Sequence, residues 1–135
     1  MVSLVSSLKA IADEKTLTLF NAIAAKAGNT DSLRKKVAFS RKQYYMRISV
    51  LTKAGLIRRN NGIYSLTSLG KVTHSAQSLI GEAVNNYWKL KAIDSIESSD
   101  LNNNRNNTFS TEERKKIMDS LIDKESEIKG ILLKS

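Results

Sequence analysis

The first thirty residues carry apolar side chains at helical spacing. Between residues 4 and 27 they recur every three or four positions, which predicts helices with one buried face. Asp13 interrupts this pattern as a candidate N-cap, so we expect either one helix or two. Gly28 favours a helix end, and Thr30 or Asp31 can cap a short helix that follows.

The next segment predicts a capped helix over residues 41–54. Ser40 is a residue type that accepts hydrogen bonds from the free N–H groups at a helix start, and Gly55 is typical of a helix end. The apolar face of this helix consists of Tyr44, Ile48 and Leu51. Their spacings of four and three bury one side of the helix and leave the other side exposed.

An Asn61-Gly62 pair separates two short runs that contain β-branched and aromatic residues. Both residues tolerate the positive φ of a type I′ turn, so Asn-Gly is a strong local signal for a β-hairpin. We therefore expect a two-stranded hairpin over about residues 57–67.

The helical period returns at Thr67 or Ser68, and we expect one long helix to about residue 96. One face has the alternating steps of three and four that are typical of a heptad seam. It consists of Leu69, Val72, Ala76, Leu79, Ala83, Asn86, Leu90 and Ile93. A second stripe consists of Ile80, Val84 and Tyr87, with Trp88 nearby. This wide apolar surface indicates packing on the helix's own domain as well as on a partner.

Residues 97–109 are rich in asparagine and poor in apolar groups, so we expect a flexible loop there. Ser110 and Glu113 match the Ser-x-x-Glu capping box ahead of an amphipathic helix over residues 110–135. The apolar side of that helix carries Ile117, Leu121, Ile128 and Ile131. The predicted fold is mainly α with a small β-hairpin: a domain of residues 1–96, the loop, and a C-terminal helix.

Positive charge is concentrated in one part of the chain. The net charge is +9, yet the segment from Ser32 to Gly81 contains ten lysines and arginines and no Asp or Glu. Ordinary solvated surfaces intersperse both signs. An acid-free segment of this length therefore indicates a surface that meets a polyanion, such as nucleic acid or a lipid headgroup layer. An ordinary solvated basic face is the alternative.

The element order and this charge together predict a winged helix-turn-helix domain that binds duplex DNA. In that fold the third helix, here about residues 41–54, enters the major groove, and the hairpin lies on the backbone or in the minor groove. The side chains expected to contact DNA are Arg34, Lys35, Lys36, Ser40, Arg41, Lys42, Gln43, Tyr45, Arg47, Arg58, Arg59, Asn60 and Asn61. Those expected to point outward from the helix are Arg41, Lys42, Gln43, Tyr45 and Arg47.

A palindromic DNA site suits a protein with two-fold symmetry, so we expect a homodimer. Its contacts are expected at Leu69, Val72, Ala76, Leu79, Ala83 and Leu90. Packing of the same seam inside one chain is the alternative.

Four stretches of the sequence resemble winged-helix regulators of the ArsR-like superfamily. They are Leu-Lys-Ala-Ile-Ala-Asp-Glu (8–14), Ser-Arg-Lys-Gln-Tyr-Tyr-Met-Arg-Ile (40–48), Lys-Ala-Gly-Leu-Ile (53–57) and Tyr-Ser-Leu-Thr-Ser-Leu-Gly-Lys (64–71). The Arg-Lys-Gln-Tyr-Tyr form is most similar to archaeal ArnR-type regulators. The resemblance covers roughly residues 8–90 and implies a homodimer that represses or activates nearby promoters.

The sequence gives poor support for an enzyme or a metal sensor. The chain has no cysteine, and His74 is its only histidine, which we interpret as a structural residue. No Gly-rich phosphate loop is visible, so no cofactor is expected. No apolar run approaches the roughly 18 residues of a membrane span, and we expect a cytoplasmic protein. The alternative function is a protein-interaction module of the transcription machinery, which would use the winged helix as a scaffold and the C-terminal helix to engage a partner.

Overall fold

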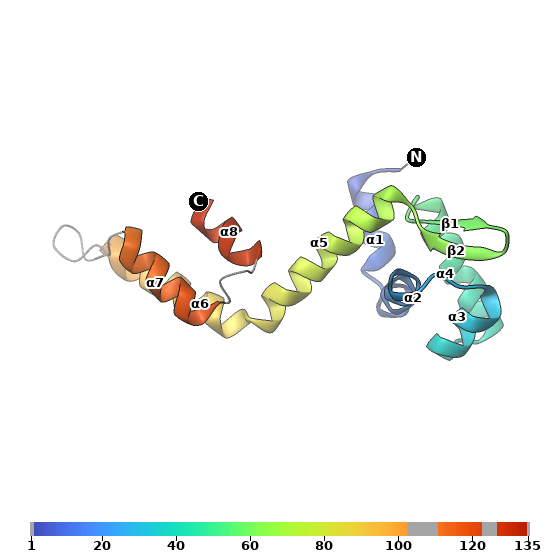
Figure 1. The fold of residues 1–135 in the computed structure, drawn as a ribbon, viewed down its shortest axis with the longest axis horizontal. Helices are drawn as coiled ribbons and strands as arrows, with labels where there is room; N and C mark the ends of the chain where they lie inside the picture. The colour runs from blue at the N-terminus through green and yellow to red at the C-terminus, as the bar shows by residue number, and fades with distance from the viewer. Residues whose placement is uncertain (1, 103–110, 123–126, 135) are drawn as a thin grey trace. The chain divides into compact units, whose positions relative to one another are not determined.

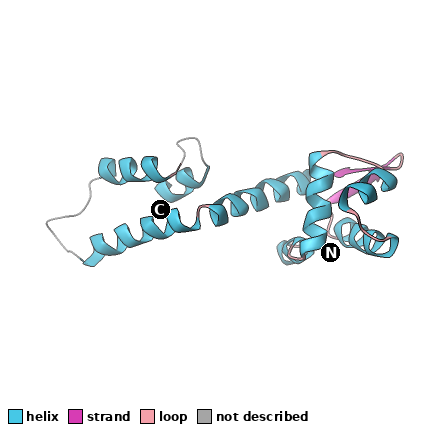
Figure 2. Ribbon diagram, turned by 90° about the horizontal axis from the view of Figure 1, so that it is seen from below, coloured by secondary structure: helices cyan, strands magenta, loops and turns pink. Residues whose placement is uncertain are grey.

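The computed structural model describes residues 2–102, 111–122 and 127–134. It is mainly helical, with one small antiparallel hairpin in the described residues (Figure 2). The chain divides into two compact units, Met1–Ala76 and Gln77–Ser135. The division falls within a helix, whereas the sequence had suggested a domain of residues 1–96.

The first unit contains four helices, the hairpin and the start of a fifth helix (Figure 1). These elements are α1 (Leu4–Ile11), α2 (Glu14–Ala25), α3 (Thr30–Val37), α4 (Arg41–Lys53), β1 (Ile57–Asn60), β2 (Ile63–Leu66) and the first half of α5 (Ser68–Asn85). Helix α2 contacts α1, α3, α4 and β2, so it is the central helix of this unit.

Capping side chains set the starts of these helices. The carboxylate of Asp13 accepts the Thr16 N–H at the start of α2, which confirms the predicted cap. Helix α3 is capped by Asn29, whose side chain accepts a hydrogen bond from the Ser32 N–H at 2.9 Å. The prediction of Thr30 or Asp31 as this cap was therefore wrong by one or two positions, because Asn29 already has the extended backbone of an N-cap.

The hairpin forms where the Asn-Gly pair predicts it. Asn61 and Gly62 have φ values of 52° and 77°, the left-handed conformations of the predicted type I′ turn. Arg58 pairs with Ser65, which puts their side chains on the same face of the hairpin. Gly28 and Tyr64 also exchange two backbone hydrogen bonds, of 3.2 and 2.8 Å, and tie the chain after α2 to β2.

The core of the first unit collects the apolar faces of α2, α4 and the hairpin. Its largest fully buried side chains include Phe20, Leu19 and Ile23 of α2. The predicted apolar face of α4 is buried as expected: Tyr44, Ile48 and Leu51 are 0%, 6% and 0% exposed. Burial of one face fixes which side of α4 remains available to a ligand.

The second unit begins within α5 and contains α6 (Tyr87–Asn102), α7 (Thr111–Leu121) and α8 (Glu127–Lys134). The predicted single helix over residues 68–96 is interrupted at Asn86, which separates α5 from α6. The Asn86 side-chain amide donates to the Glu82 carbonyl oxygen at 2.8 Å, where its own backbone N–H also bonds. Such a side-chain bond competes with regular helix geometry.

Two further predictions for this unit were wrong. Residues 97–102, expected in a loop, belong to α6, and the other part of that loop and Ser110 lie outside the described residues. The predicted single C-terminal helix is two helices, α7 and α8. On one continuous helix Ile122 and Ile128 would point about 120° apart. The division lets both join Ile93 and Met118 in one core.

No helix in the described part of the chain combines the length and the apolar character that a membrane crossing requires.

Candidate nucleic-acid interface

Helix α4 presents an exposed stripe opposite its buried face. Arg41 and Lys42 in the first turn are exposed, and Tyr45, one turn later, is 50% exposed. The buried face behind this stripe leaves the helix little freedom to rotate. Figure 1 shows α3, α4 and the hairpin turn on one side of the first unit.

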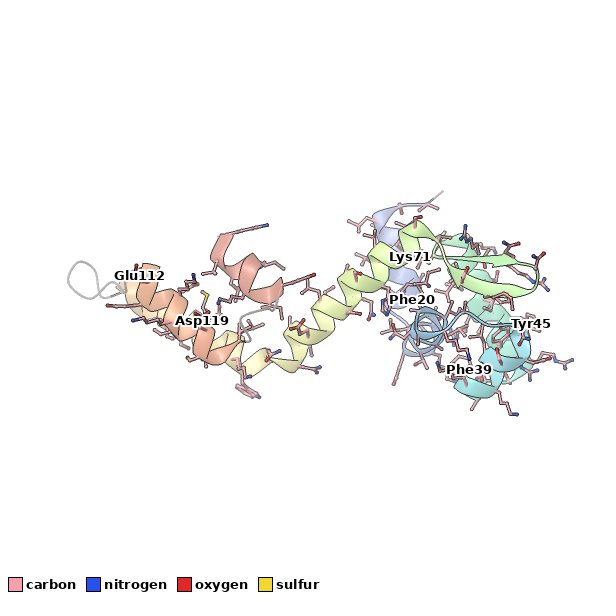
Figure 3. All side chains as sticks on the ribbon, viewed as in Figure 1. Phe20, Phe39, Tyr45, Lys71, Glu112 and Asp119 are labelled. Atoms are coloured by element: carbon pink, nitrogen blue, oxygen red, sulfur yellow. The ribbon has the colours of Figure 1, made fainter. Side chains whose placement is uncertain are left out.

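The Tyr45 ring, labelled in Figure 3, is supported by its neighbour in the sequence. Tyr44 is fully buried, and its ring meets the Tyr45 ring edge-on, with 5.4 Å between centroids and 78° between planes. Burial raises the pKa of Tyr44, so that hydroxyl stays neutral at physiological pH. Tyr45 is thus held as an amphipathic group with half of its surface in solvent.

Arg47 does not point outward, which corrects the sequence-based expectation. Its Nη1 lies 2.9 Å from Oδ2 of Asp13 and 3.5 Å from the Thr16 hydroxyl, and its side chain is only 18% exposed. Asp13 also accepts the Thr16 N–H and hydroxyl. These two hydrogen bonds, followed by the Arg47 charge, lower the pKa of Asp13. Arg47 therefore links α4 to the start of α2.

Ser40 and Gln43 bond to each other's backbone at the start of α4. The Ser40 hydroxyl oxygen accepts the Gln43 N–H at 3.2 Å, and Gln43 Oε1 accepts the Ser40 N–H at 3.4 Å. This reciprocal pair is a capping box and confirms Ser40 as the cap. Gln43 is half-buried, so it is less available to a base than the exposed Arg41 and Lys42.

The predicted hairpin residues are all at the surface. Arg58, Arg59, Asn60 and Asn61 are exposed on β1 and the turn. The Arg59 guanidinium carbon lies 5.8 Å from the centroid of the buried Tyr64 ring, a cation–π contact that orients it. Because β1 contacts α4, these arginines belong to the same packed assembly as the α4 stripe.

The three basic residues of α3 form its last turn. Lys35 and Lys36 are exposed, whereas Arg34 is half-buried. Cations at this end also stabilise the helix dipole, so part of their role is structural. The tight turn after α3 places Ala38 in the left-handed region, with φ of 55°, before Ser40 starts α4.

Among the exposed residues of α4 that were absent from the predicted site, Met46 and Ser49 continue its stripe. Met46 is 48% exposed, one turn after Lys42, and Ser49 is exposed one turn after Tyr45. The spacing of four residues from those predicted positions was the signal that could have identified them.

The predicted dimer seam is divided between the two units. Leu69, Val72 and Ala76 of the first unit are exposed. In the second unit, Leu79, Ala83 and Leu90 are half-buried against Ile93, Met118, Ile122 and Ile128, which is the intramolecular packing left open as the alternative. The second stripe is exposed instead: Ile80, Val84, Tyr87 and Trp88 are 59%, 66%, 53% and 76% exposed.

In the part of the chain that the structure describes, no group of three or more His, Cys, Asp or Glu side chains is arranged to hold a metal ion. Comparison with models of protein families and with curated proteins finds no match to this chain.

Proposed function

We propose that this chain is a winged helix-turn-helix regulator that binds duplex DNA in a sequence-specific manner. In this proposal α4 enters the major groove, and the hairpin of β1 and β2 is the wing on the backbone or in the minor groove. The helix-turn-helix is α3, the turn at residues 38–40, and α4.

One observation carries the proposal: the exposed side of α4 carries Arg41 and Lys42 and no acidic residue, while its other side is anchored in the core. Arg41 and Lys42 are solvated, their helix is fixed by Tyr44, and Arg59 is oriented on the neighbouring strand. The segment from Ser32 to Gly81 that contains all of them has no acidic residue to repel phosphate.

The structure changes which side chains we assign to base reading. We assign Arg41, Lys42 and Tyr45 to base edges, together with the neighbouring Met46 and Ser49. Arginine or lysine pairs with guanine, and an apolar group suits a thymine methyl. Arg47 is withdrawn from this role because its guanidinium is engaged by Asp13. Lys35, Lys36, Arg58 and Arg59 are assigned to phosphates.

Selection from a random duplex library, followed by fluorescence-anisotropy titration at two salt concentrations, tests the proposal. Arg41→Ala is expected to reduce the ratio of preferred to scrambled affinity roughly tenfold, since one bidentate contact contributes about 1–3 kcal/mol of discrimination. Arg59→Ala is expected to weaken both duplexes alike and to lower the salt slope by about 1. Lys9→Ala, an exposed cation on α1 outside the acid-free segment, is the matched control.

Failure of the selection to enrich any sequence would reduce the proposal to non-specific binding by a basic surface. An unchanged preference in Arg41→Ala, combined with a lost preference in Lys9→Ala, would remove α4 as the reading helix.

We also propose that the protein acts as a homodimer through the second apolar stripe of the second unit. Ile80, Val84 and Trp88 follow one another at helical spacing and are all more than half exposed. Large apolar surfaces of this kind typically mark interaction sites, and the same stripe on a second copy is the simplest complement. The C-terminal helices α7 and α8 already bury Met118, Ile122 and Ile128 within their own unit. That packing gives the protein-interaction alternative less apolar surface than its sequence suggested.

A further inference from the structure

A cavity of about 440 Å³, open to solvent, lies on the first unit between α2, the hairpin and the first turns of α5. This volume falls in the range of small-molecule sites, which run from roughly 300 to 1,000 Å³. Part of its lining is apolar and comes from α2 and β2, including the buried Ile23 and the half-buried Leu66.

Cationic and hydroxyl side chains complete the lining. Arg58 and Ser65 share one face of the hairpin because they are paired in register. On α5, Lys71 lies three residues before His74 and four before Ser75, spacings that place both beside it. In the described part of the chain neither Arg58 nor Lys71 has an ion-pair partner.

The imidazole of His74 is held in a defined orientation. The Phe20 ring meets it edge-on, with 5.9 Å between ring centroids and 66° between planes. Figure 3 shows Phe20 on α2 and Lys71 on the first turns of α5. The cavity thus combines a supported imidazole with two cations and two hydroxyl groups.

This lining selects a particular ligand chemistry. A metal cation would be repelled by Arg58 and Lys71, since none of the described residues that line the cavity is a carboxylate. A neutral apolar molecule would gain nothing from the two cations. An inorganic anion would satisfy the cations but leave the apolar surface of Ile23 and Leu66 uncovered. An apolar body that carries an anionic group matches both parts.

We propose that this cavity binds a small organic anion, an apolar body with one carboxylate or phosphate group, and that this ligand competes with DNA. The anionic group contacts Arg58, Lys71 and His74, while the apolar body covers Ile23 and Leu66. The competition rests on the proposed function, because Arg58 is there assigned to a DNA phosphate. A ligand that engages Arg58 lowers DNA affinity, and by thermodynamic reciprocity DNA lowers ligand affinity by the same factor.

Binding is measured first without DNA. His74 is the only histidine, so its imidazole C–H resonances in the NMR spectrum of the full chain are unambiguous. At constant pH the protein is titrated with benzoate, with phenyl phosphate, with inorganic phosphate and with the uncharged benzamide. We expect saturable shifts with benzoate and phenyl phosphate and none with benzamide.

Substitutions then test the assigned contacts. Lys71→Met and Arg58→Met are each expected to weaken binding of the organic anions about tenfold, as loss of a charge-assisted hydrogen bond implies. Lys9→Met removes the same charge from α1, outside the cavity, and is expected to bind like the unsubstituted chain. Lys71 and Arg58 are both exposed, so their replacement leaves the core intact.

Each other result overturns a defined part of the proposal. Equal shifts with benzamide, or equal affinity in Lys71→Met and Lys9→Met, would remove the anion site. Inorganic phosphate as tight as phenyl phosphate would show a phosphate site without an apolar subsite. Organic-anion binding that leaves DNA affinity unchanged would remove the competition alone. The NMR titration contains no DNA, so it tests ligand binding even if the chain does not bind DNA.

Discussion

The carboxylate of Asp13 lies where the start of α2 meets α4. It accepts the Thr16 N–H and hydroxyl at 3.0 and 2.9 Å and pairs with Arg47. One side chain therefore caps a helix and also binds the arginine that would otherwise extend the exposed face of α4. At the scale of single residues, this contact changes the candidate site more than any other.

Asp13→Asn is expected to destabilise the protein only where the carboxylate is ionised. Asparagine caps a helix about as well as aspartate, so the substitution removes charge and little else. The folded-state pKa of Asp13 is lowered from 3.8. Its stabilisation is therefore fully present well above pH 3.8 and is lost as pH falls through the lower folded value. Urea midpoints of Asp13→Asn and of the unsubstituted chain, measured from pH 7 down to pH 2, check this. A difference between the two midpoints that stays constant across that range would contradict it.

Gly70 and Gly81 allow a matched comparison within α5. A Cβ at Gly70 would overlap with the Leu56 carbonyl oxygen and lie 3.3 Å from the Leu66 Cβ, whereas a Cβ at Gly81 meets nothing within 4 Å. Gly70→Ala is expected to cost about 1–3 kcal/mol or more, as overpacking does. Gly81→Ala is expected to stabilise by about 1 kcal/mol because alanine favours a helix. Chemical denaturation of both variants measures the change in the free energy of unfolding. A change of the same sign in both would show that the close approach at Gly70 is misplaced.

Side chains close in sequence determine where the helices and the hairpin begin. Helix α4 begins where Ser40 and Gln43 satisfy each other's backbone, and the hairpin turns where Asn61 and Gly62 adopt positive φ. These interactions span two to three residues, so the sequence pattern alone predicts the Ser40 cap and the turn. At the scale of elements, local chemistry decides where helices and strands begin.

Ser40→Ala is expected to reduce the free energy of unfolding by about 1 kcal/mol, because it removes the oxygen that accepts the Gln43 N–H. Ser49→Ala is the matched control, since Ser49 is exposed within the same helix. There alanine has the higher helix propensity, so a small stabilisation is expected. Thermal unfolding compares the stability of the two variants. A loss of stability in Ser49→Ala as large as in Ser40→Ala would argue against the capping box.

At the scale of the whole molecule, the second unit leaves one apolar stripe uncovered. Lys91 lies 5.7 and 5.6 Å from the ring centroids of Tyr87 and Trp88 and borders this stripe with a positive charge. Ile80 and Val84 continue it along α5. The proposed homodimer predicts that a second copy covers these side chains.

Val84→Glu is expected to convert a dimer into a monomer, because it places a charge in the centre of the proposed contact. Ser78→Glu adds the same charge at another exposed position of α5 and is expected to remain dimeric. Sedimentation equilibrium measures the mass, and circular dichroism checks that helix content is unchanged. A monomeric unsubstituted chain, or a dimeric Val84→Glu, would remove the stripe as the interface.

The sequence by itself determined the helical period of the N-terminal region, the cap at Asp13, the capped helix after Ser40 and the Asn-Gly hairpin. It also determined the acid-free basic segment. These features depend on neighbours within about four residues, or on composition, and need no knowledge of the fold.

Only the tertiary structure decided which side chains remain available to a ligand. Arg47 forms an ion pair with Asp13, 34 positions earlier. In the second unit, Met118 and Ile122 pack against the heptad seam. The two helices α7 and α8 likewise bring Ile122 and Ile128 into one core. These contacts join residues far apart in the chain, and helical periodicity reports only which face is apolar. It does not report whether that face meets the same chain, a partner or solvent.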